Sequence, residues 1–376
     1  MKISIITFSR AKNYGGILQA YALYRYLADQ GYECEFIDYI LARSNIYDKK
    51  SYVDATTCQS RFWGKNKLTK CVWSILIFNK IRADYGVFFN FIEQKAKFSK
   101  RYFSLEELIK DPPIADVYIT GSDQVWNTQF TKNEEIDLPF YLAFAKGKKI
   151  SYASSFGRDY IRPENEKTIK KYLSDYAHIS VREPSGQMIL EKLGIDSTVV
   201  LDPTLLCKAS IWNEICSEKI NEQDYILLYQ VRFNKGLSDV AKELARKNGK
   251  KLITITMNRN DKRKITGKCV MTPTVKEWLS YIKNADAIIT DSFHATVFSI
   301  LFKKNFAANV ATRKEMSGRI SNLLKMLELD SHKMTDMSVD TASKIIAADS
   351  DWDQVETKLE EKKRFSQDWL KTAIEN

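Results

Sequence analysis

Short apolar runs and amphipathic stretches alternate at the start of the chain. Residues 2–8 (KISIITF) form a run rich in β-branched side chains, which is typical of a buried strand. After a polar loop, residues 17–28 place apolar side chains at helical spacing, and residues 33–39 form a second apolar run. This order of strand, helix and strand predicts a βαβ unit and therefore a parallel sheet.

The same rhythm continues along the chain and restarts after its midpoint. Further strands are predicted at residues 116–120, 149–153, 179–181, 199–201, 225–231, 252–256 and 287–290. Asp202-Pro203 separates the two series, since the residue before a proline favours an extended conformation. We therefore predict an α/β protein with two doubly wound Rossmann-like domains, residues 1–201 and 202–350, facing each other across a cleft. A charged amphipathic helix over residues 351–376 is expected to end the chain.

Residues 49–101 interrupt this pattern. They contain twelve Lys and Arg, only three acidic residues, and eight Trp and Phe. We interpret the segment as a basic helical insertion in the first domain, over about residues 49–105. Its aromatic residues can form a core under a solvated basic face, or they can contact an anionic membrane surface. Single-stranded nucleic acid is a further alternative, which we do not expect.

Composition narrows the classes of protein that fit. The chain has 376 residues, with 58 Lys+Arg against 47 Asp+Glu, and its net charge of +11 suits nucleic acid, a membrane surface or a small anionic substrate. None of the six cysteines forms a C-x-x-C pair and the three histidines are scattered, so we expect neither a disulfide framework nor a metal site. The longest strongly apolar run, residues 71–78, is too short to span a bilayer. We expect a cytoplasmic protein, at most peripheral on the inner face of the cell membrane.

Two polar loops follow strands of the first domain, where ligands of such sheets bind. The first contains Asn13, Tyr14, Gly15 and Gly16, whose backbone amides can approach a ligand at a helix N-terminus. The alternative is a plain tight turn. The second contains Ser122, Asp123, Gln124 and Trp126, which can hold sugar hydroxyls with Trp126 as a stacking platform. Helix capping by Ser122 or Asp123 is the alternative there.

The second domain supplies a candidate catalytic residue. His294 follows a predicted strand and opens a helix, so it points toward the cleft; the alternative is a structural histidine beside a capping Asp291 or Ser292. Arg182, Arg232 and Arg319 follow strands and suit bidentate recognition of carboxylate or phosphate, although each alone also suits a salt bridge. Together these residues favour an anionic ligand in the cleft.

These residues resemble the polysaccharide pyruvyl transferase family. The resemblance covers residues 1 to about 330 and rests on the order and spacing of short motifs. The motifs are NYGGILQAY at 13–21, GSDQVWN at 121–127, YASSFG at 152–157, VRE at 181–183, LDPT at 201–204, DSFHAT at 291–296 and SGRI at 317–320.

The resemblance implies a two-domain fold like that of GT-B glycosyltransferases. It implies transfer of pyruvate from phosphoenolpyruvate to a sugar of a cell-surface polysaccharide or its lipid-linked precursor, which usually forms a cyclic ketal and releases phosphate. No cofactor is implied beyond the donor substrate. Catalysis falls on His294, and the expected donor residues are Arg232, Arg319, Arg182 and Ser292. The expected acceptor residues are Asn13, Tyr14, Gly15, Gly16, Ser122, Asp123, Gln124 and Trp126.

One position departs from the family pattern. Many members carry arginine where Phe293 follows Ser292, so the cation for the donor must come from elsewhere in this chain. A polyprenyl-linked acceptor would fit a basic, aromatic insertion facing a membrane. The alternative enzyme is a sugar-nucleotide glycosyltransferase with the same fold. Such an enzyme requires polar or acidic residues that bind the ribose and base of the nucleotide, and the sequence does not reveal them. A membrane- or nucleic-acid-binding module explains the charge but leaves His294 unexplained.

Overall fold

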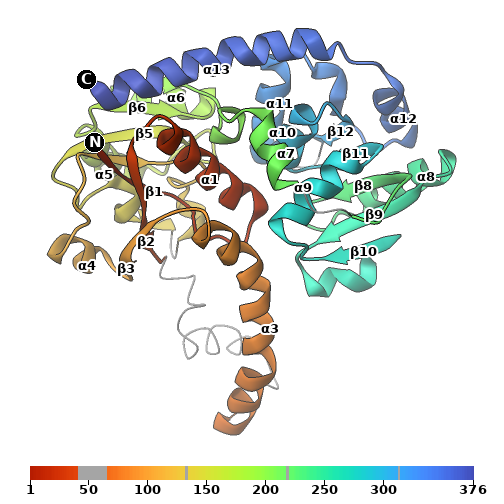
Figure 1. Ribbon diagram of the computed structural model, residues 1–376, viewed down its shortest axis with the longest axis horizontal. Coiled ribbons are helices and arrows are strands. Elements are labelled where there is room, and N and C mark those ends of the chain that lie inside the picture. Colours follow the sequence, from red (N-terminus) through yellow and green to blue (C-terminus); the bar gives the residue numbers. More distant parts are fainter. Residues whose placement is uncertain (41–65, 132–133, 217–219, 312–313) are drawn as a thin grey trace.

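The computed structural model describes residues 1–40, 66–131, 134–216, 220–311 and 314–376. They form two parallel β-sheets with helices packed on their faces, and the two sheets lie side by side in Figure 1. This architecture confirms the predicted fold class of two doubly wound α/β domains. Residues 49–65 of the basic segment lie outside the described residues.

The first sheet has seven parallel strands in the order β3-β2-β1-β4-β5-β6-β7. They are β1 (Lys2–Ile6), β2 (Glu33–Tyr39), β3 (Phe98–Tyr102), β4 (Val117–Thr120), β5 (Lys148–Ser154), β6 (His178–Val181) and β7 (Thr198–Val199). The accompanying helices are α1 (Tyr14–Asp29), α3 (Lys67–Glu93), α4 (Leu105–Lys110), α5 (Pro163–Leu173) and α6 (Pro184–Lys192). Strand β1 lies between β2 and β4, and its Ile3, Ile5 and Ile6 are buried, which accounts for the apolar run at the start of the chain.

The second sheet has six parallel strands in the order β10-β9-β8-β11-β12-β13. They are β8 (Tyr225–Tyr229), β9 (Lys251–Thr256), β10 (Lys268–Met271), β11 (Ala287–Thr290), β12 (Asn305–Asn309) and β13 (Lys333–Met334). The helices of this half are α7 (Ala209–Ile215), α8 (Lys235–Lys247), α9 (Val275–Asn284), α10 (Phe293–Leu301), α11 (Lys314–Met326), α12 (Val339–Ala347) and α13 (Trp352–Glu375).

The end of the predicted helical insertion is a strand instead. Residues 98–102 (FSKRY) form β3, which pairs with β2 at the edge of the first sheet. Lys100 and Arg101 are exposed there, so the polar sequence fits an edge strand that has one face open to solvent. Of the rest of the insertion, the structure describes the single helix α3, whose first half projects away from the body (Figure 1).

Two contacts connect the halves of the molecule. The Tyr14 ring of α1 stacks on Trp278 of α9 with centroids 5.0 Å apart, and its hydroxyl donates to the Pro273 carbonyl at 2.6 Å. Helix α13 runs along both halves (Figure 1) and returns to the first sheet, where the Ser366 hydroxyl accepts a hydrogen bond from the Leu201 amide at 3.0 Å. Helices α1 and α13 therefore join the two halves of the molecule at two separate places.

Candidate functional site

The loop after β1 makes room for a side chain from the other half. Asn13 caps α1, and its side-chain oxygen accepts hydrogen bonds from the amides of Gly15 at 2.9 Å and Gly16 at 3.3 Å. The cap therefore uses two amides that we expected to be available to a ligand. A Cβ on Gly15 would lie 2.0 Å from His294 Nδ1, so glycine at this position is what allows the histidine ring to approach.

His294 lies in the first turn of α10, two residues after the capping residue Ser292. The Ser292 hydroxyl accepts from the Ala295 amide at 3.3 Å, which explains why the helix begins there. The imidazole is almost fully buried, and its Nε2 lies 3.6 Å from Asp202 Oδ2. That distance is too long for a hydrogen bond, and Nε2 has no hydrogen-bond partner among the described residues.

Asp202 is a fully buried carboxylate between the two series of strands. Its Oδ1 accepts from the amide and hydroxyl of Thr204 at 3.0 and 2.6 Å. Its Oδ2 accepts from Arg182 Nη1 at 3.0 Å and from Ser122 Oγ at 3.3 Å. Burial by itself raises the pKa of Asp202, but His294, Arg182 and Thr204 together hold it well below the usual range. The side chain therefore carries a fixed negative charge beside His294.

Arg182 is surrounded by carboxylates of its own half. Its Nε donates to Glu183 at 2.7 Å, its Nη1 to Asp202, and its Nη2 lies 3.8 Å from Asp123 Oδ1. Burial lowers the pKa of Arg182, but these three carboxylates outweigh burial and raise it. Carboxylates of the protein therefore already neutralise the charge of Arg182, and its role in binding a donor stays a prediction.

Phe293 stands where many family members carry arginine. The Arg182 guanidinium lies over the Phe293 ring, 4.9 Å from its centroid, in a cation–π contact. The departure from the family pattern thus places an aromatic ring, rather than a second cation, beside Arg182.

Arg319 of α11 is a buried cation without a carboxylate partner. Its residue is 9% exposed, it forms no ion pair with any described residue, and its Nε has no hydrogen-bond partner there. With the Gln124 amide oxygen turned toward it, Nη1 and Nη2 donate to that oxygen at 2.9 and 3.0 Å. Burial and the neighbouring charge of Arg182 lower the pKa of Arg319, and they outweigh the more distant carboxylates of Glu183, Asp123 and Asp202, which raise it. Such a group favours an anion as its missing partner.

The loop after β4 contributes three of its four predicted residues. Ser122 donates to Asp202, Gln124 contacts Arg319, and the Asp123 carboxylate faces the position where a Cβ on Gly16 would stand, 3.5 Å away. Asp123 has a positive φ of 76°, and its carboxylate accepts from the Gln124 amide at 2.9 Å. This turn directs the polar side chains toward the second half of the molecule.

Two aromatic residues predicted to bind the acceptor are structural instead. Trp126 is buried, its Nε1 donates to the Phe140 carbonyl at 3.1 Å, and its ring packs against Tyr141 and Phe156. Trp126 is therefore not an exposed stacking platform. Tyr14 is likewise fully buried, and its ring and hydroxyl bind the second half of the molecule rather than a sugar.

Arg232 lies at the rim of the site and remains apart from its centre. It is exposed in the loop after β8 and forms no ion pair with the residues that the structure describes. The Val231 amide beside it donates to Asp291 Oδ1 at 2.7 Å, which joins this loop to the one preceding His294. Arg232 therefore stays a candidate for an incoming anion.

Sequence reasoning missed Asp202 as a member of the site. From the sequence, Asp202 was interpreted only as part of a domain boundary and of the LDPT motif. The partners that reveal its role come from Ser122, Arg182 and His294, which are far from it along the chain.

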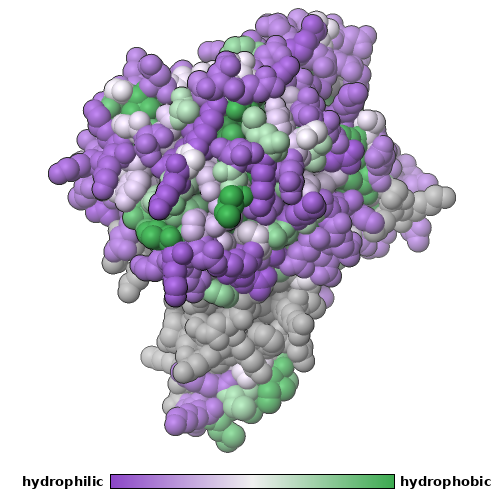
Figure 2. Space-filling view, turned by 60° about the vertical axis from the view of Figure 1, so that its left-hand side comes forward, coloured by the Kyte–Doolittle hydropathy of each residue, from purple (hydrophilic) through white to green (hydrophobic). Residues whose placement is uncertain are grey.

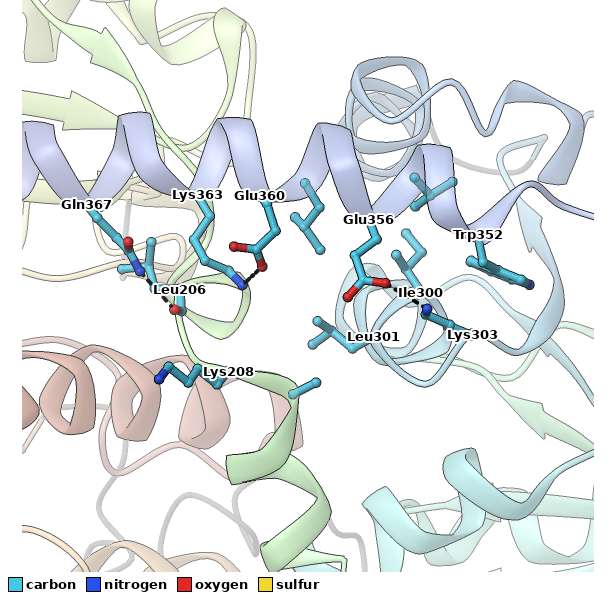
Figure 3. Close-up of a pocket in the computed structure, with 13 residues that line it drawn as sticks. Leu206, Lys208, Ile300, Leu301, Lys303, Trp352, Glu356, Glu360, Lys363 and Gln367 are labelled. Atoms are coloured by element: carbon cyan, nitrogen blue, oxygen red, sulfur yellow. Dashed lines mark hydrogen bonds and ion pairs between the residues drawn. The ribbon is translucent and has the colours of Figure 1, made fainter.

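Two cavities lie beneath α13. One of about 240 Å³ is lined mainly by apolar side chains, and its wall includes Arg182, Asp202, Phe293 and Arg319, so it borders the site. The other, of about 410 Å³, lies at the opposite end of α10 between Leu206 and Trp352 (Figure 3). Ion pairs of Lys303 with Glu356 and of Lys363 with Glu360 close its walls, and none of the predicted site residues lines it.

Metal ligands are not grouped in the described part of the chain: no three His, Cys, Asp or Glu side chains there are placed to share an ion. That the reaction needs no metal remains a prediction.

Known structures with a similar fold include two UDP-N-acetylglucosamine 2-epimerases and a plant protein solved with quercetin. The UDP-N-acetylglucosamine 2-epimerase from Rickettsia bellii is 12% identical, with a TM-score of 0.54 over 98% of this chain and 95% of that one. The Arabidopsis thaliana UGT89C1, complexed with quercetin, is 9% identical, with a TM-score of 0.52 over 99% of each chain. The UDP-GlcNAc 2-epimerase from Methanocaldococcus jannaschii is 16% identical, with a TM-score of 0.50 over 93% and 92%. At these identities the likeness shows a GT-B-like fold and no particular activity.

Sequence comparison identifies the family. No curated protein matches the chain significantly. A family model for polysaccharide pyruvyl transferases matches residues 13–308, which include the Asn13 cap, Asp202 and His294. The chain therefore belongs to the polysaccharide pyruvyl transferase family.

Proposed function

We propose that the protein transfers pyruvate from phosphoenolpyruvate to a sugar of a cell-surface polysaccharide or of its lipid-linked precursor. Membership of the family supports a transferase that modifies polysaccharides. The observation that carries the choice of donor is Arg319, a cation that is nine-tenths buried and lacks a carboxylate partner among the described residues. Phosphoenolpyruvate carries both a carboxylate and a phosphate, and either would complete this site.

The proposed chemistry requires three proton transfers beside the bound donor. C3 of phosphoenolpyruvate gains a proton while a sugar hydroxyl attacks C2 and loses its own. The C2–O bond to phosphate then breaks, a second hydroxyl adds to C2 to close the ketal, and its proton leaves with the phosphate. His294 is the candidate for moving these protons, because its Nε2 has no hydrogen-bond partner and its ring faces the Asp202 carboxylate.

Asp202 acts in this scheme as a positioning residue. Its carboxylate stays ionised in the folded protein and lies 3.6 Å from the imidazole, so it keeps a negative charge beside the ring. Gly15 lies against the Nδ1 side of the imidazole ring and leaves the space that the ring occupies. The acceptor is expected against Asn13, Gly16 and the 122–124 turn.

Thermal unfolding in the presence of phosphoenolpyruvate tests the donor. A ligand at 100 times its dissociation constant should stabilise the protein by about 2.7 kcal/mol. We expect this shift in the wild type and in Arg246→Met, an exposed arginine of α8 paired with Glu243, but not in Arg319→Met. UDP-sugars serve as the comparison ligands.

A shift with a UDP-sugar alone would favour the glycosyltransferase alternative. Phosphate release from phosphoenolpyruvate, with pyruvate recovered on a saccharide acceptor, is the direct confirmation. An Arg319→Met protein that binds phosphoenolpyruvate as tightly as the wild type would contradict the assigned donor site.

A further inference from the structure

Helix α3 has two halves with opposite surroundings. Its C-terminal end packs against the body: Phe88 packs against Tyr14 with ring centroids 4.9 Å apart, Phe91 packs against Tyr21, and Glu93 forms an ion pair with Arg10. Its N-terminal half projects from the body, as the orange helix of Figure 1 shows. The helix has 27 residues, so it extends for about 40 Å.

The projecting half exposes a row of apolar side chains. Leu68, Val72, Ile75 and Leu76 recur at spacings that place them on one face, and Leu68 is 74%, Ile75 60% and Leu76 61% exposed. Figure 2 shows these hydrophobic atoms gathered at the free end of the helix. Exposed apolar residues scattered singly are ordinary, but a contiguous face on a projecting helix marks an interaction surface.

The charge of the projecting part of α3 indicates what kind of partner binds its apolar face. Residues 67–83 contain four basic residues and no acidic one, and the exposed Lys67 borders the apolar face. A second copy of the chain would bring like charges together at this face. An anionic lipid surface is complementary to both features, because apolar side chains enter the headgroup boundary while basic ones remain at the phosphates.

We propose that the exposed face of α3, formed by Leu68, Val72, Ile75 and Leu76 with Lys67 at its border, docks the protein on an anionic membrane surface. No helix in the described ranges is long and apolar enough to cross a bilayer, so the proposed contact is interfacial. The C-terminal end of α3 contacts Arg10 of the loop after β1 and Tyr14 at the start of α1, and α3 also contacts α9. The helix thereby connects the docking face to the entrance of the candidate site.

Co-sedimentation of the full chain with vesicles tests the proposal. The probes are phosphatidylcholine vesicles with and without phosphatidylglycerol, at low and high salt. The wild type should bind the anionic vesicles, more weakly at high salt. Leu68→Ser/Ile75→Ser should lower the partition coefficient by about tenfold or more, because two large side chains no longer enter the boundary. Lys67→Gln should lower it by about fivefold.

The matched control is Ile109→Ser/Ile114→Ser, which removes two exposed isoleucines of the same half of the molecule away from α3. Its vesicle binding should equal that of the wild type. Equal binding by the Leu68→Ser/Ile75→Ser protein, or no binding of the wild type to anionic vesicles, would overturn the proposal. A wild-type dimer that this double substitution converts to a monomer would assign the face to a second copy instead. The vesicle measurement needs no substrate, so its outcome is independent of pyruvyl transfer.

Discussion

Two buried arginines lie near each other in this site, one from each half of the molecule, and they differ in how closely they pair with the same three carboxylates. Arg182 lies among Glu183, Asp202 and Asp123, which raise its pKa against the effect of burial. Arg319 has no carboxylate partner among the described residues, and burial lowers its pKa. The pair shows why an arginine at a strand end is ambiguous in sequence: its partners decide whether its charge holds the fold or awaits a ligand.

The same contrast separates the two buried histidines. His332 has both ring nitrogens engaged, with the Phe306 carbonyl at 2.8 Å and the Ser350 hydroxyl at 2.7 Å. His294 leaves Nε2 without a hydrogen-bond partner beside Asp202. A saturated histidine belongs to the fold, whereas an unsaturated one in a cleft is suited to proton transfer.

The largest effect expected from this contrast is on turnover. His294→Asn should reduce kcat by about 10²- to 10⁴-fold, because the proton carrier is lost. His332→Asn should lower the melting temperature, since it breaks two buried hydrogen bonds, while kcat per folded molecule is retained. Steady-state kinetics and thermal unfolding of both variants separate the roles. Equal kcat in the two variants would remove His294 from the mechanism.

Replacing each of the two arginines should change the free energy of unfolding by amounts that differ by several kcal/mol. Arg182→Met leaves Asp202 and Glu183 without their buried cation and should cost about 3–5 kcal/mol of unfolding free energy. Arg319→Met removes a buried charge that has no carboxylate partner among the described residues, so it should be neutral or stabilising. Urea unfolding measures both. A destabilised Arg319→Met protein would mean that its cation is already compensated.

Adjacent glycines provide a finer comparison. A Cβ on Gly15 would lie 2.0 Å from His294 Nδ1, whereas the nearest atom to a Cβ on Gly16 is 3.4 Å away. Gly15→Ala should displace the imidazole and lower kcat by about 100-fold. Gly16→Ala should alter kcat much less. Kinetics of the two variants, with circular dichroism to verify folding, test whether the ring position matters.

The smallest expected effect is the contribution of Asp202 to the pH dependence of the free energy of unfolding. The folded protein holds the pKa of Asp202 well below its usual value, so the stability it contributes is present above the unfolded pKa of about 3.9. As the pH falls below about 4, the unfolded state gains a proton first and this contribution declines by up to about 1.4 kcal/mol per pH unit. Asp202→Asn should lack this part of the slope in urea titrations between neutral and acid pH. An identical slope in both proteins would show that Asp202 is not strongly perturbed.

The sequence predicted the fold better than the site. Buried parallel strands such as β1 and β8 appear as apolar runs, so the α/β rhythm was visible. Strand β3 was missed because its exposed edge position permits the basic sequence FSKRY. His294 and the 122–124 turn could be proposed as site residues because both follow predicted strands.

The rest of the site depends on contacts between distant residues. Trp126 was misread because a position next to a loop does not reveal which way a ring faces. The roles of Asp202, Arg182 and Arg319 depend on neighbours that the chain brings together only when both halves have folded. The local sequence pattern does not reveal which distant residues these side chains will contact.

Helix α13 has a consequence for the synthesis of the protein. The strands of the first sheet end at Val199, yet their cover includes Ser366 against Leu201, Trp369 near Tyr152, and the Ile374 carbonyl, which accepts from Lys148 Nζ at 3.0 Å. The half that leaves the ribosome first therefore receives this packing partner only after the whole second half has been synthesised. Until then it exposes apolar surface of the kind that chaperones bind.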